Sequence, residues 1–422
     1  MNEKKTFAVI TLGCKLNYAE SATIARDLMQ QGYEKISSSK KADVYLINTC
    51  SVTEHADKKS RQAIRKVLRI NPSAYVVVTG CSAQLRPGSL GAIKGISSLF
   101  GTGFRDRIIR AVGDLEAGKV YIRPSETEDG FFRAYSAGEN NRDRTRSFLK
   151  VQDGCDYHCT YCTVPLARGR SRNIPIADVV SQAREIAAKG VKEIVLTGVN
   201  TGDFGKTTGE SFSDLLDALA TVSGIERYRI SSIEPNLLTD GIIEKIAAGK
   251  PFLPHFHIPL QSGSDPVLKR MGRRYRVDLF AQKMQKIHSL MPHAFTGIDV
   301  ITGFPGESEE DFINTYNLLK DLKPSYLHVF PFSVRPGTRA ASFPVSERVR
   351  DGIITRRAHE LGELSDMLHR DFILANKGRQ EEVLFEGKTR DRKMHGYTRN
   401  YIRVERPYQR ALINRVVEVI LD

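Results

Sequence analysis

The chain has 422 residues, of which 41% are hydrophobic, and this is enough to bury the cores of two or three domains. It contains no run of ~18 apolar residues, and the first apolar run stops at Cys14 and Lys15, so we expect neither a membrane span nor a secretory signal. Lysine and arginine number 63 against 49 aspartates and glutamates, a net charge of +14, which favours a polyanionic partner such as nucleic acid.

Three cysteines near the amino end each follow an apolar run. Cys14, Cys50 and Cys81 close the runs FAVITLGC, ADVYLINTC and AYVVVTGC, and helices fit between them at 20–31 and 55–70. This alternation predicts parallel strands joined by helical crossovers, whose carboxyl ends meet at one edge of an open α/β sheet. We therefore expect a shared three-thiol pocket, the alternative being three separately buried small side chains.

The helix expected at 55–70 carries cations along one side and apolar residues along the other. The cations at helical spacing are Lys58, Arg61, Arg65 and Arg69. A further set, Arg168, Arg170 and Arg172, follows the second cysteine motif described below. We expect both sets to contact RNA phosphates, against the alternatives of a solvated helix face and of local ion pairs.

A polar segment at 122–145 predicts an interdomain linker, and the motif CxxxCxxC follows it. Cys155, Cys159 and Cys162 can hold one iron-sulfur cube and leave its fourth iron open to an exogenous ligand, whereas a structural zinc site usually pairs two CxxC units. The spacing resembles that of radical S-adenosylmethionine (SAM) enzymes, with Tyr161 as the aromatic residue before the last cysteine. All six cysteines are then ligands, which leaves none for disulfides and favours a cytoplasmic location.

Six strand candidates alternate with helices downstream, at 148–152, 193–200, 228–233, 255–260, 296–303 and 325–332. Such βα units predict a partial parallel barrel, with its ligand site at the carboxyl ends of the strands. The resemblance implies that polar residues there surround SAM: Gly198, Asn200, Ser232, Glu234, Gln261, Ser262 and Asp299. Their alternative roles are turns, caps or internal ion pairs. His255 and His257 alternate on one strand, and packing or a hydrogen bond is expected there more than a metal pair.

The tail after a helix at 347–374 alternates like short strands and predicts a small β-barrel. Tyr397 and Tyr401 lie among cations there, a combination that suits nucleotide stacking, although an ordinary packed β module fits the same pattern. The position of the tail resembles that of the RNA-binding TRAM domain.

The whole chain resembles the radical-SAM methylthiotransferases, through TLGCKLN, NTCSVT, TGCSAQ, the CxxxCxxC loop and PLQSGSDPVLKRMGRRY. The resemblance divides the chain into a methylthiotransferase domain at 1–121, the linker at 122–145, a radical-SAM domain at 146–376 and a TRAM domain at 377–422. It implies two 4Fe-4S clusters, one cleaving SAM to a 5′-deoxyadenosyl radical and the other carrying the transferred sulfur. No side chain is nominated as a general base.

GCKLN and the basic tail resemble enzymes that methylthiolate C2 of N6-threonylcarbamoyladenosine at tRNA position 37. The alternatives are N6-isopentenyladenosine 37 and an aspartate of a ribosomal protein. The resemblance implies the tRNA anticodon stem-loop and a reducing electron donor as partners, and the sequence leaves the oligomeric state open. A noncatalytic iron-sulfur protein that binds RNA or senses redox state is the alternative from another class.

Overall fold

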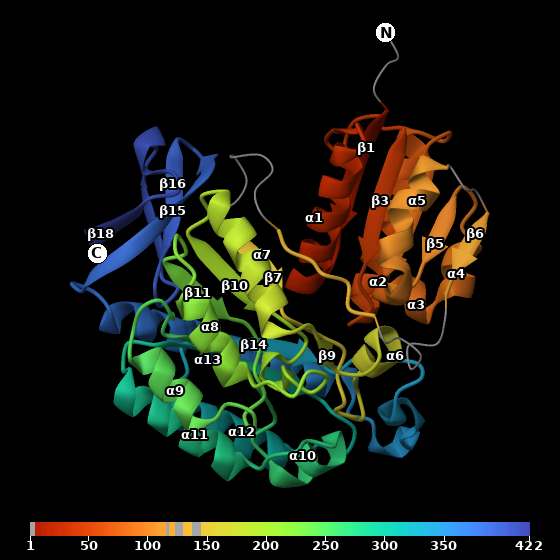
Figure 1. The fold of residues 1–422 in the computed structure, drawn as a ribbon. Helices are drawn as coiled ribbons and strands as arrows, with labels where there is room; N and C mark the ends of the chain where they lie inside the picture. Colours follow the sequence, from red (N-terminus) through yellow and green to blue (C-terminus); the bar gives the residue numbers. More distant parts are fainter. Residues whose placement is uncertain (1–4, 115–117, 123–129, 137–144) are drawn as a thin grey trace.

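A computed structural model describes residues 5–114, 118–122, 130–136 and 145–422, which form an amino-terminal α/β domain, a central partial barrel and a carboxyl-terminal β-sheet (Figure 1). Among these residues, none of the helices is both long enough and apolar enough to pass through a bilayer.

The amino-terminal domain is built on a parallel sheet with the strand order β2-β1-β3-β4-β5-β6. Its strands are β1 (Thr6–Thr11), β2 (Glu34–Lys35), β3 (Val44–Thr49), β4 (Tyr75–Gly80), β5 (Ser98–Phe100) and β6 (Lys119–Tyr121). Alternate residues of β3 and β4 point to opposite faces, because side chains alternate along a strand. Helices α1 (Lys15–Gln30) and α5 (Ile108–Gly113) cover one face, and α2 (Glu54–Ile70) covers the other.

Helix α1 starts at Lys15, five residues before the expected 20–31 segment, because Cys14 is its extended N-cap residue. Helix α2 starts close to the predicted position, where the Thr53 side chain accepts a hydrogen bond from the Ala56 backbone and Glu54 lies in the first turn.

The central domain contains the six expected parallel strands, in two three-stranded sheets with the orders β7-β10-β11 and β12-β13-β14. These strands are β7 (Arg146–Lys150), β10 (Glu193–Thr197), β11 (Arg227–Ile230), β12 (His255–Gln261), β13 (Phe295–Thr302) and β14 (Tyr326–Pro331). Single bridges, one of them between Ser232 and His257, join β11 to β12 and curve the two sheets into one partial barrel.

The outer surface of the barrel is covered by helices that bury Leu, Ile, Val and Phe side chains against the strands. They are α7 (Ile176–Ala188), α8 (Phe212–Ala220), α9 (Asp240–Ala247), α11 (Val277–Leu290), α12 (Glu309–Leu322) and α13 (Asp351–Ala375). The helix expected at 347–374 therefore begins four residues later, at Asp351.

Part of the segment expected to be a linker packs against the barrel. Tyr135 forms an antiparallel bridge with Leu149, and the Ser136 backbone donates to the Phe148 carbonyl at 2.9 Å. Ala134 is fully buried there. The described residues 130–136 thus extend the edge of β7, and the remainder of the 122–145 prediction lies largely outside the described residues.

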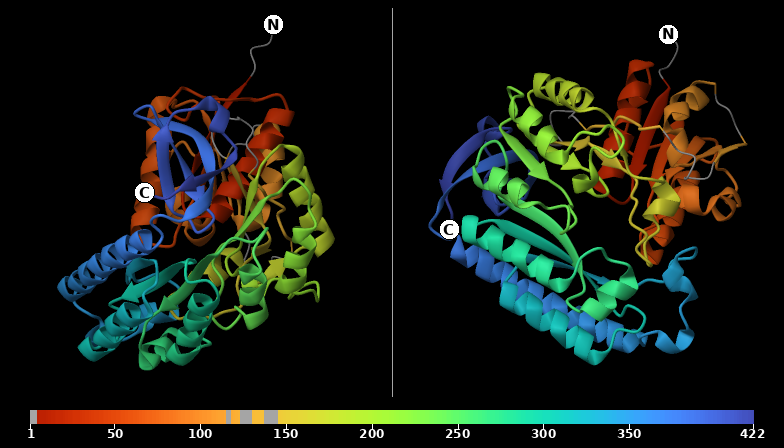
Figure 2. Two further views of the ribbon diagram at one scale, coloured as in Figure 1. Left: turned by 90° about the vertical axis from the view of Figure 1, so that its left-hand side faces the viewer. Right: turned by 60° about the horizontal axis from the view of Figure 1, so that its bottom comes forward.

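The carboxyl-terminal part is a curled antiparallel sheet with the order β17-β16-β15-β18. Its strands are β15 (Gln380–Arg390), β16 (Lys393–Thr398), β17 (Arg403–Pro407) and β18 (Val416–Ile420). Helix α13 leads to this sheet from the barrel (Figure 2). The sheet packs on the amino ends of the barrel strands: Arg227 donates to the Tyr397 carbonyl at 3.1 Å, and Asn400 donates to the His293 carbonyl at 2.8 Å.

A buried ion-pair network joins the first two domains. Glu20 of α1 lies 3.1 Å from Arg105, from Lys150 and from Arg168. Arg168 also lies 2.8 Å from Asp153, and all five side chains are almost fully buried. Burial by itself would raise the pKa of Glu20, but the charges of Arg105, Arg168 and Lys150 together outweigh it and lower the pKa to about 2, so the carboxylate is ionised at neutral pH.

We predict that Arg168→Met destabilises the protein by about 3–5 kcal/mol, because Glu20 and Asp153 would keep buried charges without this partner. Arg170→Met, two residues away and solvent-exposed, should cost less than about 0.5 kcal/mol. Urea unfolding followed by circular dichroism compares the two variants. Equal midpoints would show that the network does not stabilise the domain junction.

Candidate functional site

The structure brings Cys14, Cys50 and Cys81 to the carboxyl edge of the amino-terminal sheet, as expected. Cys50 directly follows β3 and Cys81 directly follows β4, while Cys14 precedes α1. Each thiol is within electrostatic range of the other two. Gly13, at a φ of +97°, allows the close approach, because a Cβ there would lie 2.7 Å from the Cys50 Cβ.

Asn17 ties the loops of this first triad together. Its amide nitrogen donates to the Leu12 carbonyl at 2.8 Å and to the Thr49 carbonyl at 3.0 Å, which spans the ends of β1 and β3. Its amide oxygen accepts from Arg168 at 2.6 Å. The sequence contains this residue in GCKLN, but its bridging role depends on contacts that the motif does not reveal.

The second triad lies on the loop between β8 (Gln152–Asp153) and α6 (Val164–Arg168). Cys162 is within electrostatic range of Cys155 and Cys159. Backbone N–H groups point at two of the sulfurs: Tyr157 donates to Cys155 and Val164 donates to Cys162, both at 3.4 Å. Such donors stabilise thiolates that hold an iron-sulfur cluster.

Both triads fit an iron-sulfur cluster better than one zinc ion. Each triad offers three free cysteine thiols, one short of the four ligands that a structural zinc ion takes, whereas a cube can leave its fourth iron to another ligand. Burial raises the pKa of Cys50, Cys155 and Cys162 to about 12, so a bound cationic centre is needed to keep them ionised.

Arg273 is a site residue that the sequence interpretation missed. Its guanidinium donates to the Cys159 sulfur at 3.2 Å and to the Tyr161 hydroxyl at 3.3 Å, and it also pairs with Glu234. The residue stands in a run of arginines, MGRRY, and nothing in that run separates it from its exposed neighbour Arg274. Tyr161, expected near SAM, thus contacts the arginine that binds the second triad.

Several predicted SAM residues lie after strands, as the barrel requires. Asn200 follows β10, and its buried side-chain nitrogen has no hydrogen-bond partner among the residues that the structure describes, so a bound ligand could satisfy this donor. Its oxygen accepts from the Glu234 backbone at 3.3 Å. Gly198 packs on Gln152, since a Cβ there would lie 2.9 Å from the Gln152 amide oxygen. This cluster-facing end of the barrel therefore fits SAM.

Three other predicted SAM residues are engaged in local structure. Ser232 forms the bridge to β12, Gln261 adopts a positive φ of 68° at a register shift, and the Ser262 hydroxyl accepts from the Ser264 backbone at 3.2 Å. These three residues have the local structural roles that were given as the alternative to SAM binding. Their contacts with SAM stay a prediction.

Asp299 lies within β13, not at its end as expected. Its carboxylate is 2.7 Å from the Nε2 atom of His257, whose ring lies 5.1 Å from that of His328. Neighbouring strands therefore bring Asp299 and His328 close to His257, and one ligand atom of each lies within 4.8 Å of the others, an arrangement compatible with one metal ion. His255 is buried and stacks on Phe295, as a packed histidine should.

The amino end of the barrel interior is lined by cations and aromatic rings. Arg146 lies 4.6 Å from the Tyr397 ring, and Arg229 lies 4.7 Å from the Tyr401 ring. The two tyrosine rings stack on one another at 4.8 Å. The half-buried rings therefore contact the barrel domain, as in the alternative of a packed β module, and their stacking on nucleotides stays a prediction.

The predicted RNA-contacting cations divide into two groups. Lys58, Arg65 and Arg69 are exposed on α2 and Arg61 is half-buried beside them, and Arg170 is exposed near the second triad. Arg168 and Arg172 are buried instead, and Arg172 lies 3.3 Å from Asp153. The expectation of phosphate contacts is wrong for these two arginines, because internal carboxylates and carbonyls occupy their guanidinium groups.

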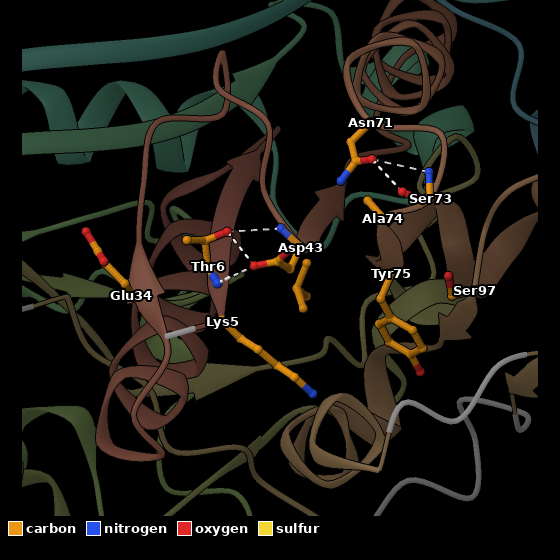
Figure 3. A pocket seen from close by; sticks show the side chains of 10 residues that line it. Lys5, Thr6, Glu34, Asp43, Asn71, Ser73, Ala74, Tyr75 and Ser97 are labelled. Carbon is orange, nitrogen blue, oxygen red and sulfur yellow. Dashed lines mark hydrogen bonds between the residues drawn. The ribbon is translucent and has the colours of Figure 1, made fainter. Parts of the chain in front are cut away.

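A pocket of about 790 Å³ lies at the opposite edge of the amino-terminal sheet (Figure 3). Its polar groups satisfy one another: the Thr6 hydroxyl donates to Asp43 at 2.8 Å, and the Ser73 hydroxyl donates to Asn71 at 2.9 Å. It lies at the amino ends of the strands, away from the cysteines, so it is not part of the candidate site.

Comparisons with known proteins agree with this geometry. Residues 149–319 match the radical SAM superfamily, and residues 6–101 match a family described as uncharacterized protein family UPF0004. The fold is similar to that of the radical S-adenosylmethionine methyltransferase TsrM from Kitasatospora setae, with a TM-score of 0.58 and 14% identity over 80% of this chain and 77% of that one. Fold and site together define a radical-SAM enzyme.

Relatives of nearly full length specify the family. A threonylcarbamoyladenosine tRNA methylthiotransferase of Bacillus subtilis is 39% identical over 98% of this chain and 93% of its own length, and one of Aquifex aeolicus is 35% identical over 97% and 98%. A tRNA-2-methylthio-N(6)-dimethylallyladenosine synthase of Alkaliphilus oremlandii is 31% identical over 99% and 90%. The chain therefore belongs to the tRNA methylthiotransferase family.

We predict that anaerobically reconstituted protein binds ~8 irons per chain, and that Cys50→Ala and Cys159→Ala each bind ~4, because each variant disrupts one three-thiolate site. Iron and sulfide analysis with Mössbauer spectroscopy measures this. Tetrahedral zinc in the purified protein, or saturation of the unaltered chain at ~4 irons, would contradict the two-cluster interpretation.

We also predict that Arg273→Met makes the reduction potential of the Cys155, Cys159 and Cys162 cluster more negative, by on the order of 50–100 mV, because the reduced cluster loses a charged hydrogen bond. A redox titration followed by electron paramagnetic resonance measures the shift. Arg270→Met, which removes a surface arginine paired with Glu347, is the matched control and should leave the potential unchanged.

Proposed function

We propose that this protein transfers a methylthio group to C2 of N6-threonylcarbamoyladenosine at position 37 of tRNA, using two 4Fe-4S clusters and SAM in the cytoplasm. The observation that carries the proposal is the pair of three-thiol sites, one at the carboxyl edge of the amino-terminal sheet and one on the barrel loop. When bound, the clusters and SAM supply the radical chemistry and the sulfur that an unactivated aromatic C–H bond requires.

The residues of the chain hold these sites in register. Asn17 spans the loops of the first triad and accepts from Arg168, which ends helix α6 after the second triad and pairs with Glu20 and Asp153. A displacement of one site is thereby resisted by the buried network at the other. This fixed geometry supports a reaction in which both centres act on one substrate carbon.

The anticodon stem-loop is the proposed macromolecular substrate. The exposed cations of α2, together with Arg170, would bind its phosphates, which position RNA without reading its sequence. The relatives named for threonylcarbamoyladenosine are 39% and 35% identical, against 31% for the dimethylallyladenosine relative reported above, and this supports the choice of base modification. A reducing electron donor completes the reaction.

The proposal predicts a specific product. Reconstituted protein with SAM and reductant should convert threonylcarbamoyladenosine in tRNA to its 2-methylthio derivative, as measured by mass spectrometry of digested nucleosides. The Cys159→Ala variant should form no product and release no 5′-deoxyadenosine above background. Unchanged threonylcarbamoyladenosine, or methylthiolation of isopentenyladenosine alone, would reject the substrate assignment.

A further inference from the structure

Lys15 is a cation without an acidic partner, next to the first cysteine triad. It directly follows Cys14 as the first residue of α1, and its side chain reaches solvent and makes no hydrogen bond or ion pair with any described residue. The neighbouring arginines differ in this respect: Arg229 lies 2.9 Å from Glu193, and Arg146 lies 2.7 Å from Glu386.

The groups around Lys15 leave an excess of positive charge. Arg229, Arg146, Cys14 and Asp299 are within electrostatic range of its ammonium group, and Cys14 is expected to be engaged as a cluster ligand. Asp299 is already bonded to His257, and Glu193 is shared by Arg229 and Arg227. Every carboxylate of this set therefore has a partner, and Lys15 remains available to an anion brought in by a ligand.

The position of Lys15 matches where the modified base must lie. The reacting carbon has to reach both the Cys14 site and the barrel end that carries Cys155, Cys159 and Cys162. Helix α1 faces β7 of the barrel (Figure 1). Lys15 of the amino-terminal domain and Asp299 of the barrel are within electrostatic range of one another, so this interaction crosses the domain junction. A substituent that extends from a base held between the two sites into the barrel interior would approach Lys15, which is within electrostatic range of the interior groups Arg146, Arg229 and Asp299.

We propose that the ammonium group of Lys15 binds the carboxylate of the threonylcarbamoyl substituent and so selects this base over uncharged N6 substituents. The inference rests on the proposed function and identifies its specificity determinant. An isopentenyl group offers no charge, so it would leave Lys15 unpaired in a partly desolvated site, and that loss is what discriminates between the two bases.

Lys15 could instead serve only the anionic cluster beside it, since a cation stabilises thiolate-bound iron. That role would affect every substrate equally. Recognition of a carboxylate would affect only substrates that carry one. The two roles therefore predict different ratios of the KM for a substrate with a carboxylate to the KM for a substrate without one. The total activity alone would not distinguish them.

The experiment compares a stem-loop carrying threonylcarbamoyladenosine with one carrying its neutral carboxamide, using reconstituted enzyme. Unaltered enzyme should prefer the acid by about tenfold to a hundredfold in KM, the range for a hydrogen bond between charged groups. Lys15→Met should bring this preference to about one, and Lys15→Arg should retain it. Binding of the fluorescently labelled stem-loops without SAM should follow the same order.

Lys41→Met is the matched control, because Lys41 is an exposed lysine near the opposite edge of the same sheet. It should keep the full preference for the acid, and iron content and the KM for SAM should stay unchanged in all three variants. An equal loss for acid and carboxamide in Lys15→Met, or an unchanged preference, would overturn the inference. If unaltered enzyme modifies neither stem-loop, the proposed function fails instead.

Discussion

The buried charges between α1 and the barrel are the constraint on which the site depends. Glu20 is surrounded by Arg105, Lys150 and Arg168, which come from two domains, so both must be docked before its charge is compensated. Isolated ions in such a place would cost several kcal/mol each, and the network offsets this cost only in one geometry. The interaction thus contributes specificity of docking more than net stability, and it fixes where the two cysteine sites lie.

The sequence predicted most of the fold, because hydrophobic periodicity reports directly on strands and helices. All six barrel strands were placed within a few residues. The start of α1 was predicted five residues too late. Its N-cap residue is Cys14, and a cysteine at this position is not recognisable from the spacing of apolar residues. The packing of residues 130–136 on β7 was missed as well, because a strand edge can be covered by a segment with little apolar period.

The site was predicted unevenly, and the reason is physical. Cysteine spacing constrains metal binding strongly, so both triads could be recognised in the chain alone. The sequence around an arginine does not show whether its side chain is buried in an ion pair or exposed to a ligand. Arg168 and Arg170 both lie in ARGRSR, yet Arg168 is buried among carboxylates and Arg170 is exposed. Roles that depend on a distant partner, such as the contact of Arg273 with Cys159, cannot be read from neighbours in sequence.

The docking of the carboxyl-terminal sheet on the barrel has a wider consequence. Through Tyr397, Tyr401 and Asn400 it covers the end of the barrel away from the cysteine loop. The sheet therefore forms part of the wall at the amino end of the barrel, where its side chains pack against barrel residues. A substitution that loosens this sheet would therefore alter the packing at the amino end of the barrel, even though it lies far from either cysteine triad.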